Sequence, residues 1–154
     1  MEIKRLNQRP NIDQNNKLNK KYIQFEKLLS ELKKKELTSE VVSAINNNID
    51  HVNSITEAEN ELGKKIGRTQ SIILKLIEKE HKLVTINHYR NIWLALGMSV
   101  FGIPLGVAFG ASLGNMGFIG IGFPIGMVIG IAVGTSLDKK ASVNGKQLDL
   151  EIKY

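Results

Sequence analysis

Histidine, cysteine and serine are the side chains best suited to catalysis or metal binding, and in this sequence their spacing points to neither. The histidines are His51, which follows Asp50, His81, which follows Glu80, and His88. No two of them have the spacing of a zinc site. The sequence has no cysteine, no GxSxG nucleophile motif and no GxxxxGK[ST] phosphate-binding loop. We therefore expect a protein that is not an enzyme and that has no catalytic residue, cofactor or metal.

Glycine has the most regular spacing of any residue type. The segments "GIPLGVAFGASLG" (102–114) and "GFPIGMVIGIAVG" (122–134) each carry glycine at every fourth place and proline at the third. Small residues four apart let the backbones of two helices approach closely in lipid. The helix-packing and oligomerisation residues predicted from this spacing are Gly102, Gly106, Gly110, Gly114, Gly122, Gly126, Gly130 and Gly134. Helix kinks are predicted at Pro104 and Pro124, because proline removes a helical hydrogen bond.

The same region is free of formal charge. Residues 1–90 contain 17 Lys/Arg and 12 Asp/Glu, whereas residues 91–137 contain none. About 20 helical residues are needed to cross a membrane. Residues 92–113 and 118–137 meet that length, and "GNMG" at 114–117 has the composition of a tight turn. We expect an antiparallel transmembrane helix hairpin at 91–138. A buried hairpin of a soluble protein, or a segment that inserts only in an oligomer, remains the alternative.

The flanks of the hairpin predict its orientation. Lysine and arginine precede the first span and follow the second, and the positive-inside rule keeps such residues in the cytoplasm. The first thirty residues lack the apolar core of a secretory signal. Both termini are therefore expected on the cytoplasmic side of a bacterial inner membrane. The expected membrane-interface anchors are Tyr89, Arg90, Trp93, Lys139 and Lys140.

Residues 15–90 have the pattern of a cytoplasmic helical region. Apolar residues recur there at spacings of three and four: Leu18, Tyr22, Phe25, Leu29 and Leu32; Val42, Ile45, Ile49 and Val52; and Leu62, Ile66, Ile73, Leu76, Ile77, Leu83 and Val84. Thr38 or Ser39 is a candidate N-cap, and Thr56 with Glu59 forms a capping-box pattern. The run Asn46–Asn48 is poor helix material, so the second helix is the weakest prediction. Three such helices predict an antiparallel coiled coil or a small bundle.

The two ends of the chain are short and differ from the helical region. Residues 1–14 form an N-terminal segment, and residues 139–154 form a cytoplasmic tail. In the tail, "QLDLEIKY" alternates apolar and charged residues with the period of a strand. The tail is expected to pair with the N-terminal segment, to add a strand to a partner, or to be disordered.

The block from Tyr89 to Lys140 resembles bacterial glycine-zipper membrane proteins, in particular small double-span hairpins with N-terminal cytoplasmic helices. This resemblance implies close helix packing rather than one activity. The expected fold is therefore an all-α membrane protein with a helical or coiled-coil cytoplasmic region and a glycine-laddered hairpin. Gly97, Gly117 and Gly120 lie off the ladders, which favours a second packing face and a homo-oligomer.

Two functions remain open from the sequence. The first is an inner-membrane protein that self-associates through its glycine faces and forms an oligomeric pore or channel. The alternative is a non-conducting anchor or scaffold whose cytoplasmic helices recruit a partner protein. The lipid bilayer is the expected partner in both. Nucleic acid is not expected, because acidic residues intersperse the basic ones and no nucleic-acid-binding motif is present.

Overall fold

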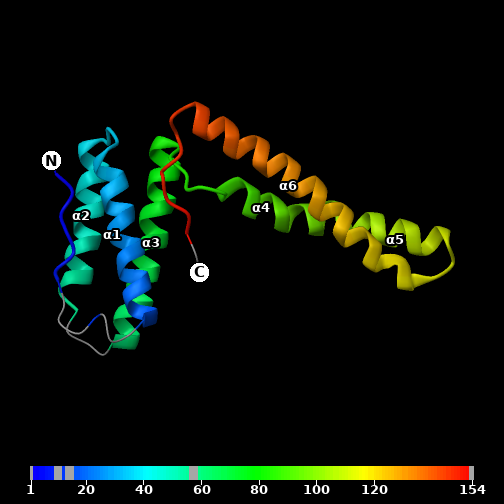
Figure 1. Cartoon of the computed structure of the whole chain (residues 1–154), viewed down its shortest axis with the longest axis horizontal. Coiled ribbons are helices and arrows are strands. Elements are labelled where there is room, and N and C mark those ends of the chain that lie inside the picture. The colour runs from blue at the N-terminus through cyan, green and yellow to red at the C-terminus, as the bar shows by residue number, and fades with distance from the viewer. Residues whose placement is uncertain (1, 9–11, 13–15, 56–58, 153–154) are drawn as a thin grey trace. The chain divides into compact units, whose positions relative to one another are not determined.

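The computed structural model describes residues 2–8, 12, 16–55 and 59–152. The chain divides into two compact units, Met1–Val84 with Leu148–Tyr154, and Thr85–Gln147. The helices of the first unit are α1 (Asn16–Lys33), α2 (Ser39–Asn53) and α3 (Glu59–His81) (Figure 1). Those of the second unit are α4 (His88–Leu96), the π-helix η2 (Gly97–Gly102), α5 (Ile103–Ser112), the 3₁₀ helix η3 (Met116–Phe118) and α6 (Ile119–Val143). The prediction of an all-helical protein with two long apolar helices is confirmed.

The first unit is a bundle of α1, α2 and α3 around an aliphatic core. The predicted stripes supply most of this core, and Leu28 on α1 joins them with a fully buried side chain. Leu76 was predicted in the core but is only partly buried at its edge. Thr38 is the N-cap residue of α2, without a side-chain capping hydrogen bond. The predicted capping box at Thr56 lies outside the described residues.

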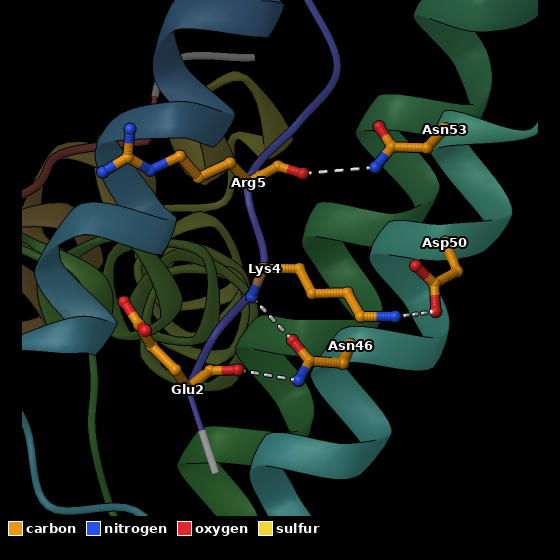
Figure 2. A network of polar contacts seen from close by, with 6 residues as sticks. All are labelled: Glu2, Lys4, Arg5, Asn46, Asp50 and Asn53. Carbon is orange, nitrogen blue, oxygen red and sulfur yellow. Dashed lines mark hydrogen bonds and ion pairs between the residues drawn. The ribbon is translucent and has the colours of Figure 1, made fainter.

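Residues 2–8 of the N-terminal segment run along α2 and are held there by two asparagine side chains (Figure 2). Asn46 accepts a hydrogen bond from the Lys4 amide at 2.8 Å and donates to the Glu2 carbonyl at 2.9 Å. Asn53 repeats this arrangement one step along the segment, accepting from the Asn7 amide at 2.9 Å and donating to the Arg5 carbonyl at 3.2 Å.

The spacing of these two asparagines matches the extended chain that they hold. Asn53 lies seven positions after Asn46 on the helix, a rise of about 10.5 Å, which equals about three residues of extended chain. Asn46, which belongs to the asparagine run predicted to weaken α2, therefore bonds the N-terminal segment. We call Asn46 and Asn53 the asparagine clamp. Between its two contacts, Lys4 Nζ also pairs with Asp50 at 2.6 Å.

The C-terminal segment packs into the same core. Leu148 and Leu150 are buried and Ile152 is partly buried, whereas Asp149 is exposed, so the alternating pattern appears as alternating burial. The Leu148 amide donates to the Val84 carbonyl at 2.9 Å. The Asp149 amide donates to the Glu31 carboxylate at 3.2 Å. The two ends of the chain thus bond to different parts of the bundle, the N-terminal segment to α2 and the C-terminal segment to Glu31 and Val84.

In the second unit, α4, η2 and α5 form one continuous helix, His88–Ser112, and the chain then turns into the helix Met116–Val143. Gly114 ends the first helix with φ +64°, and the Asn115 and Gly114 amides bond back to the carbonyls of Gly110 and Ala111. This Schellman arrangement needs a left-handed residue, which glycine adopts without strain. The Asn115 side chain then accepts from the Gly117 amide at 2.9 Å and begins the next helix. This turn, at residues 113–115, overlaps the expected turn at 114–117, and the second helix begins at Met116, before the expected start at residue 118.

Candidate functional site: the glycine contact face

The two apolar helices meet through glycine backbones rather than through side chains. A Cβ atom built on Gly122 would lie 1.9 Å from the Gly102 carbonyl oxygen, and one on Gly126 would lie 2.4 Å from the Gly97 oxygen. Real Cβ atoms do not approach backbone oxygen this closely, so only glycine fits at these positions. The buried residues of α5 and α6 within residues 103–134 are glycines. We call these facing glycines the glycine contact face.

The contacts run in opposite chain directions along the two helices. Gly134 lies against Arg90 and Tyr89, Gly130 against Trp93, and Gly106 against Ile119. Figure 1 shows α6 running back beside α4 and α5. Each later residue of the first helix therefore meets an earlier residue of the second.

Gly97 belongs to this face, although its spacing places it off the ladder. It lies five residues before Gly102, and the π-helix Gly97–Gly102 separates the two. A π turn takes one residue more than an α turn, so the five-residue step brings Gly97 onto the same side as Gly102. This corrects the expectation of a second packing face at Gly97, because the sequence spacing assumed uninterrupted α-helix.

The π-helix also shows how the first helix accommodates Pro104. A proline ring clashes with the carbonyl four residues before it and provides no amide hydrogen. The π turn lies directly before this point, where such bulges relieve the clash. Close by, the Ser99 hydroxyl donates to the Ala95 and Leu96 carbonyls at 2.9 and 3.2 Å. Pro124 lies inside α6, exposed and away from the contact face.

The remaining glycines of the region have other roles. A Cβ on Gly110 would meet the sulfur of Met116 at 3.2 Å, which is a tight contact with a flexible side chain. Gly114 was predicted as a packing residue, but nothing lies within 4 Å of its Cβ position, and it serves the turn instead. The off-ladder Gly117 meets only the Asn115 side chain, and Gly120 faces open space.

A buried carboxylate closes the end of the glycine contact face opposite the turn. Asp138 on α6 is 7% exposed and accepts from the backbone amides of Tyr89 and Arg90 at 3.0 and 2.9 Å. These amides belong to the first turn of α4, whose orphan donors and positive dipole end favour a negative charge. The N-cap residue Asn87 makes no such side-chain bond. Asp138 thus caps α4 from the neighbouring helix.

Sequence reasoning missed Asp138, although a signal was present. It is the first charged residue after the uncharged block, and it follows Gly134 by one helical turn. The predicted interface residues surround it. Tyr89 and Trp93 are partly exposed, whereas Arg90, Lys139 and Lys140 are exposed. Lys139 and Lys140 lie inside α6, because this helix continues beyond the predicted end to Val143.

The outward faces of the two helices are apolar. Large hydrophobic side chains that remain exposed in this unit are Ile92, Leu96, Val100, Phe101, Ile103, Val107, Phe109, Leu113, Met116, Ile121, Phe123, Ile125, Met127, Val128 and Val143. In the bundle, only Ile23 and Ile72 among the described residues are comparably exposed. A continuous apolar surface of this kind marks a region that contacts lipid or another protein.

The described residues contain no group of three His, Cys, Asp or Glu placed to hold a metal ion. Comparisons with protein-family models, curated proteins and solved structures found no match to this chain.

Proposed function

We propose that this protein is a two-span integral membrane protein whose apolar helices anchor the helical bundle at the cytoplasmic face of a bacterial inner membrane. In this proposal α4–α5 and α6 form an antiparallel transmembrane hairpin, and the glycine contact face joins its two helices. The observation that carries it is the reversal of burial in this unit, with glycines inside and large apolar side chains outside. Lipid is the solvent in which that arrangement is favourable.

Length and charge support the same proposal. The two helices contain 25 and 28 residues, enough at about 1.5 Å per residue to cross a hydrocarbon core of about 30 Å. Residues 91–137 carry no formal charge. Basic residues lie at the start of the first helix and at the end of the second, whereas the turn between the helices has none. The positive-inside rule assigns such basic flanks to the cytoplasm.

The contact face favours an anchor over an oligomeric pore. A glycine-zipper oligomer would use the ladder glycines against neighbouring subunits, but all of them except Gly114, which serves the turn, already lie against the other helix of the same chain. Self-association would need another face, such as the open side at Gly120. Homo-oligomerisation and kinship with glycine-zipper proteins therefore stay predictions. The bundle is the part that we propose to recruit a cytoplasmic protein partner.

A carbonate wash of isolated membranes, followed by native mass spectrometry of the purified protein in detergent, tests the proposal. We expect the protein to stay in the membrane pellet and the mass to be that of a monomer. Release into the wash would contradict membrane anchoring. A closed oligomer that conducts ions in a planar bilayer would replace the anchor with the pore.

A further inference from the structure

The bundle contains a pocket that neither the core nor the proposed anchoring explains. Its volume is about 590 Å³, and it lies between α1, α3 and the C-terminal segment. Its lining is mostly apolar, with Ile72, Leu74 and Ile152 among the residues that form it. Gly67 leaves its wall open, because a Cβ there would meet only Lys21 Nζ, at 4.0 Å.

Gln70 gives this pocket an unsatisfied donor. Its side chain lines the pocket and is 4% exposed, and its Nε2 atom has no hydrogen-bond partner among the described residues. A buried amide without a partner is costly, and native structures rarely keep one without a reason. A ligand atom that accepts a hydrogen bond would remove this cost.

The charges at the pocket are of one sign. Lys21, Lys64 and Arg68 line it, and no aspartate or glutamate is among the described lining residues. Lys21 Nζ bonds the Gly63 carbonyl at 3.2 Å, and Lys64 pairs with Glu61 at 2.9 Å. Arg68 is exposed at the pocket, and its charge adds to that of Lys64 in lowering the pKa of the nearby Glu61 carboxyl. The pocket therefore combines an apolar wall, a positive rim and a buried donor.

We propose that this pocket binds a small anionic amphiphile, a molecule with one carboxylate or phosphate head and a short apolar chain. The head accepts from Gln70 Nε2 and is attracted by the guanidinium of Arg68. The apolar chain lies against Ile72 and Ile152. This inference does not depend on membrane anchoring, because every residue it uses belongs to the bundle unit.

The test uses the full chain in phosphatidylcholine nanodiscs, with octanoate as the probe. Octylammonium, which has a chain of the same length and a head group without a hydrogen-bond acceptor, is its counterpart. Side-chain amide NMR signals of Gln70 and methyl signals of Ile72 and Ile152 report binding. We expect octanoate to shift all of them saturably, and octylammonium to leave the Gln70 amide unchanged. No saturable shift, or an equal response to both probes, would overturn the proposal.

Two matched variants distinguish the effect of a charge at the pocket from that of a charge elsewhere on α3. Arg68→Gln and Lys75→Gln remove the same charge from exposed positions of α3, but only Arg68 lines the pocket. We expect Arg68→Gln to weaken octanoate binding by about fivefold or more, as loss of a charged contact predicts, and Lys75→Gln to change it by less than about twofold. Equal effects would contradict the proposal.

Gln70→Met keeps the side-chain size and removes the donor. We expect weaker octanoate binding by about tenfold, read from the isoleucine methyl signals, together with a higher melting temperature of the ligand-free protein. A lower melting temperature would mean that Gln70 is satisfied without a ligand, against the proposal. Nanodiscs containing phosphatidylglycerol and no octanoate identify the source of the head group: a Gln70 shift there assigns it to bilayer lipid, and a shift with octanoate alone assigns it to a free amphiphile.

Discussion

In the bundle, the fully buried side chains are large, among them Phe25, Leu28 and Ile45, and the lysines lie at the surface. In α5 and α6, the buried residues of the uncharged stretch are glycines, and large side chains such as Val128, 67% exposed, point outward. Both regions are helices packed on helices. The bundle gains stability by removing apolar area from water, whereas the two apolar helices gain it by close backbone contact. The same chain thus follows two packing rules, and each rule predicts its own pattern of sensitive positions.

The largest expected difference is between two phenylalanines. Phe25 is fully buried in the bundle, and Phe123 on α6 is 42% exposed. We expect Phe25→Ala to lower the free energy of unfolding of the bundle by about 3–5 kcal/mol, because it leaves a cavity. Phe123→Ala should cost less than about 1 kcal/mol, because lipid fills the space. Hydrogen exchange of α1 and α6 amides in nanodiscs measures both changes, and similar losses would remove the contrast.

The second comparison enlarges a residue, from glycine to alanine, at two positions of α6. A Cβ on Gly122 would lie 1.9 Å from the Gly102 oxygen, whereas one on Gly120 meets nothing within 4 Å. We expect Gly122→Ala to weaken the contact of the two helices by about 2–3 kcal/mol. Gly120→Ala should be neutral or stabilising by up to about 1 kcal/mol, because alanine favours helix.

The single tryptophan, Trp93, reports this contact, because its carbonyl lies against Gly130. Its fluorescence in a titration with sodium dodecyl sulfate follows separation of the helices. If the two helices separate at the same detergent fraction in the Gly120→Ala and Gly122→Ala variants, the glycine contact face does not hold them together.

A polar contact at the end of this face has a smaller expected effect. Asp138→Asn keeps one acceptor oxygen but removes the charge that bonds the Tyr89 and Arg90 amides. We expect a loss of about 1–2 kcal/mol and faster exchange of those two amides. Lys139→Gln changes the charge at the next, exposed position and serves as the control. Unchanged exchange in Asp138→Asn would contradict the cap.

In the bundle, the asparagine clamp is the corresponding polar contact. Asn46 is 3% exposed and bonds Lys4 and Glu2, whereas the neighbouring Asn47 is exposed. We expect Asn46→Ala to cost about 1–2 kcal/mol and to increase cleavage of the N-terminal segment by a protease. Asn47→Ala should leave both unchanged. Equal cleavage of the two variants would show that the clamp does not hold the segment.

The smallest effect concerns the C-terminal segment and depends on pH. The Lys34 ammonium holds the pKa of Glu31 below its ordinary value of 4.5 against the opposing effect of burial, and the Asp149 amide lowers it further. A lowered pKa means that the stabilising contribution is fully present above pH 4.5 and is lost as the pH falls through the folded-state pKa. The protection factor of the Asp149 amide should therefore fall in acid, and Glu31→Gln should remove this dependence. A flat profile in the unmodified protein would contradict the assignment.

Periodicity in the sequence predicted most of the helices, because the stripes from Leu18 to Ile77 follow the helical period that burial requires. The extension of the third stripe to Leu83 and Val84 was wrong as a helix prediction, because α3 ends at His81 and these two residues are buried in the segment that follows it. The turn at Gly114 was predictable from composition. The place of Gly97 was not, because a π turn cannot be read from spacing that assumes a regular α-helix. The asparagine clamp was hidden for a different reason. Low helix propensity at Asn46 indicates a weak helix, and only the bound N-terminal segment shows what the side chain gains there.

The candidate site was predictable as a set of glycines but not as a closed face. Spacing shows that a groove exists on each helix, yet it does not tell whether the groove meets the other helix or another subunit. Gln70 gave no signal in the sequence, since a single polar residue acquires its role only from what the fold places around it. Asp138 stood out only as the first charge after the uncharged block, and its bonds to the start of α4 could not be read from that position.

Cysteine labelling at both ends of the hairpin tests the central claim most directly, because the chain contains no cysteine of its own. Leu113→Cys places a thiol on an exposed residue beside the turn, and Lys146→Cys places one just after α6. With a membrane-impermeant maleimide on intact spheroplasts, we expect position 113 to be labelled at once and position 146 to be labelled only after permeabilisation. Protection of both positions until permeabilisation, or labelling of both before it, would contradict a two-span anchor with cytoplasmic ends.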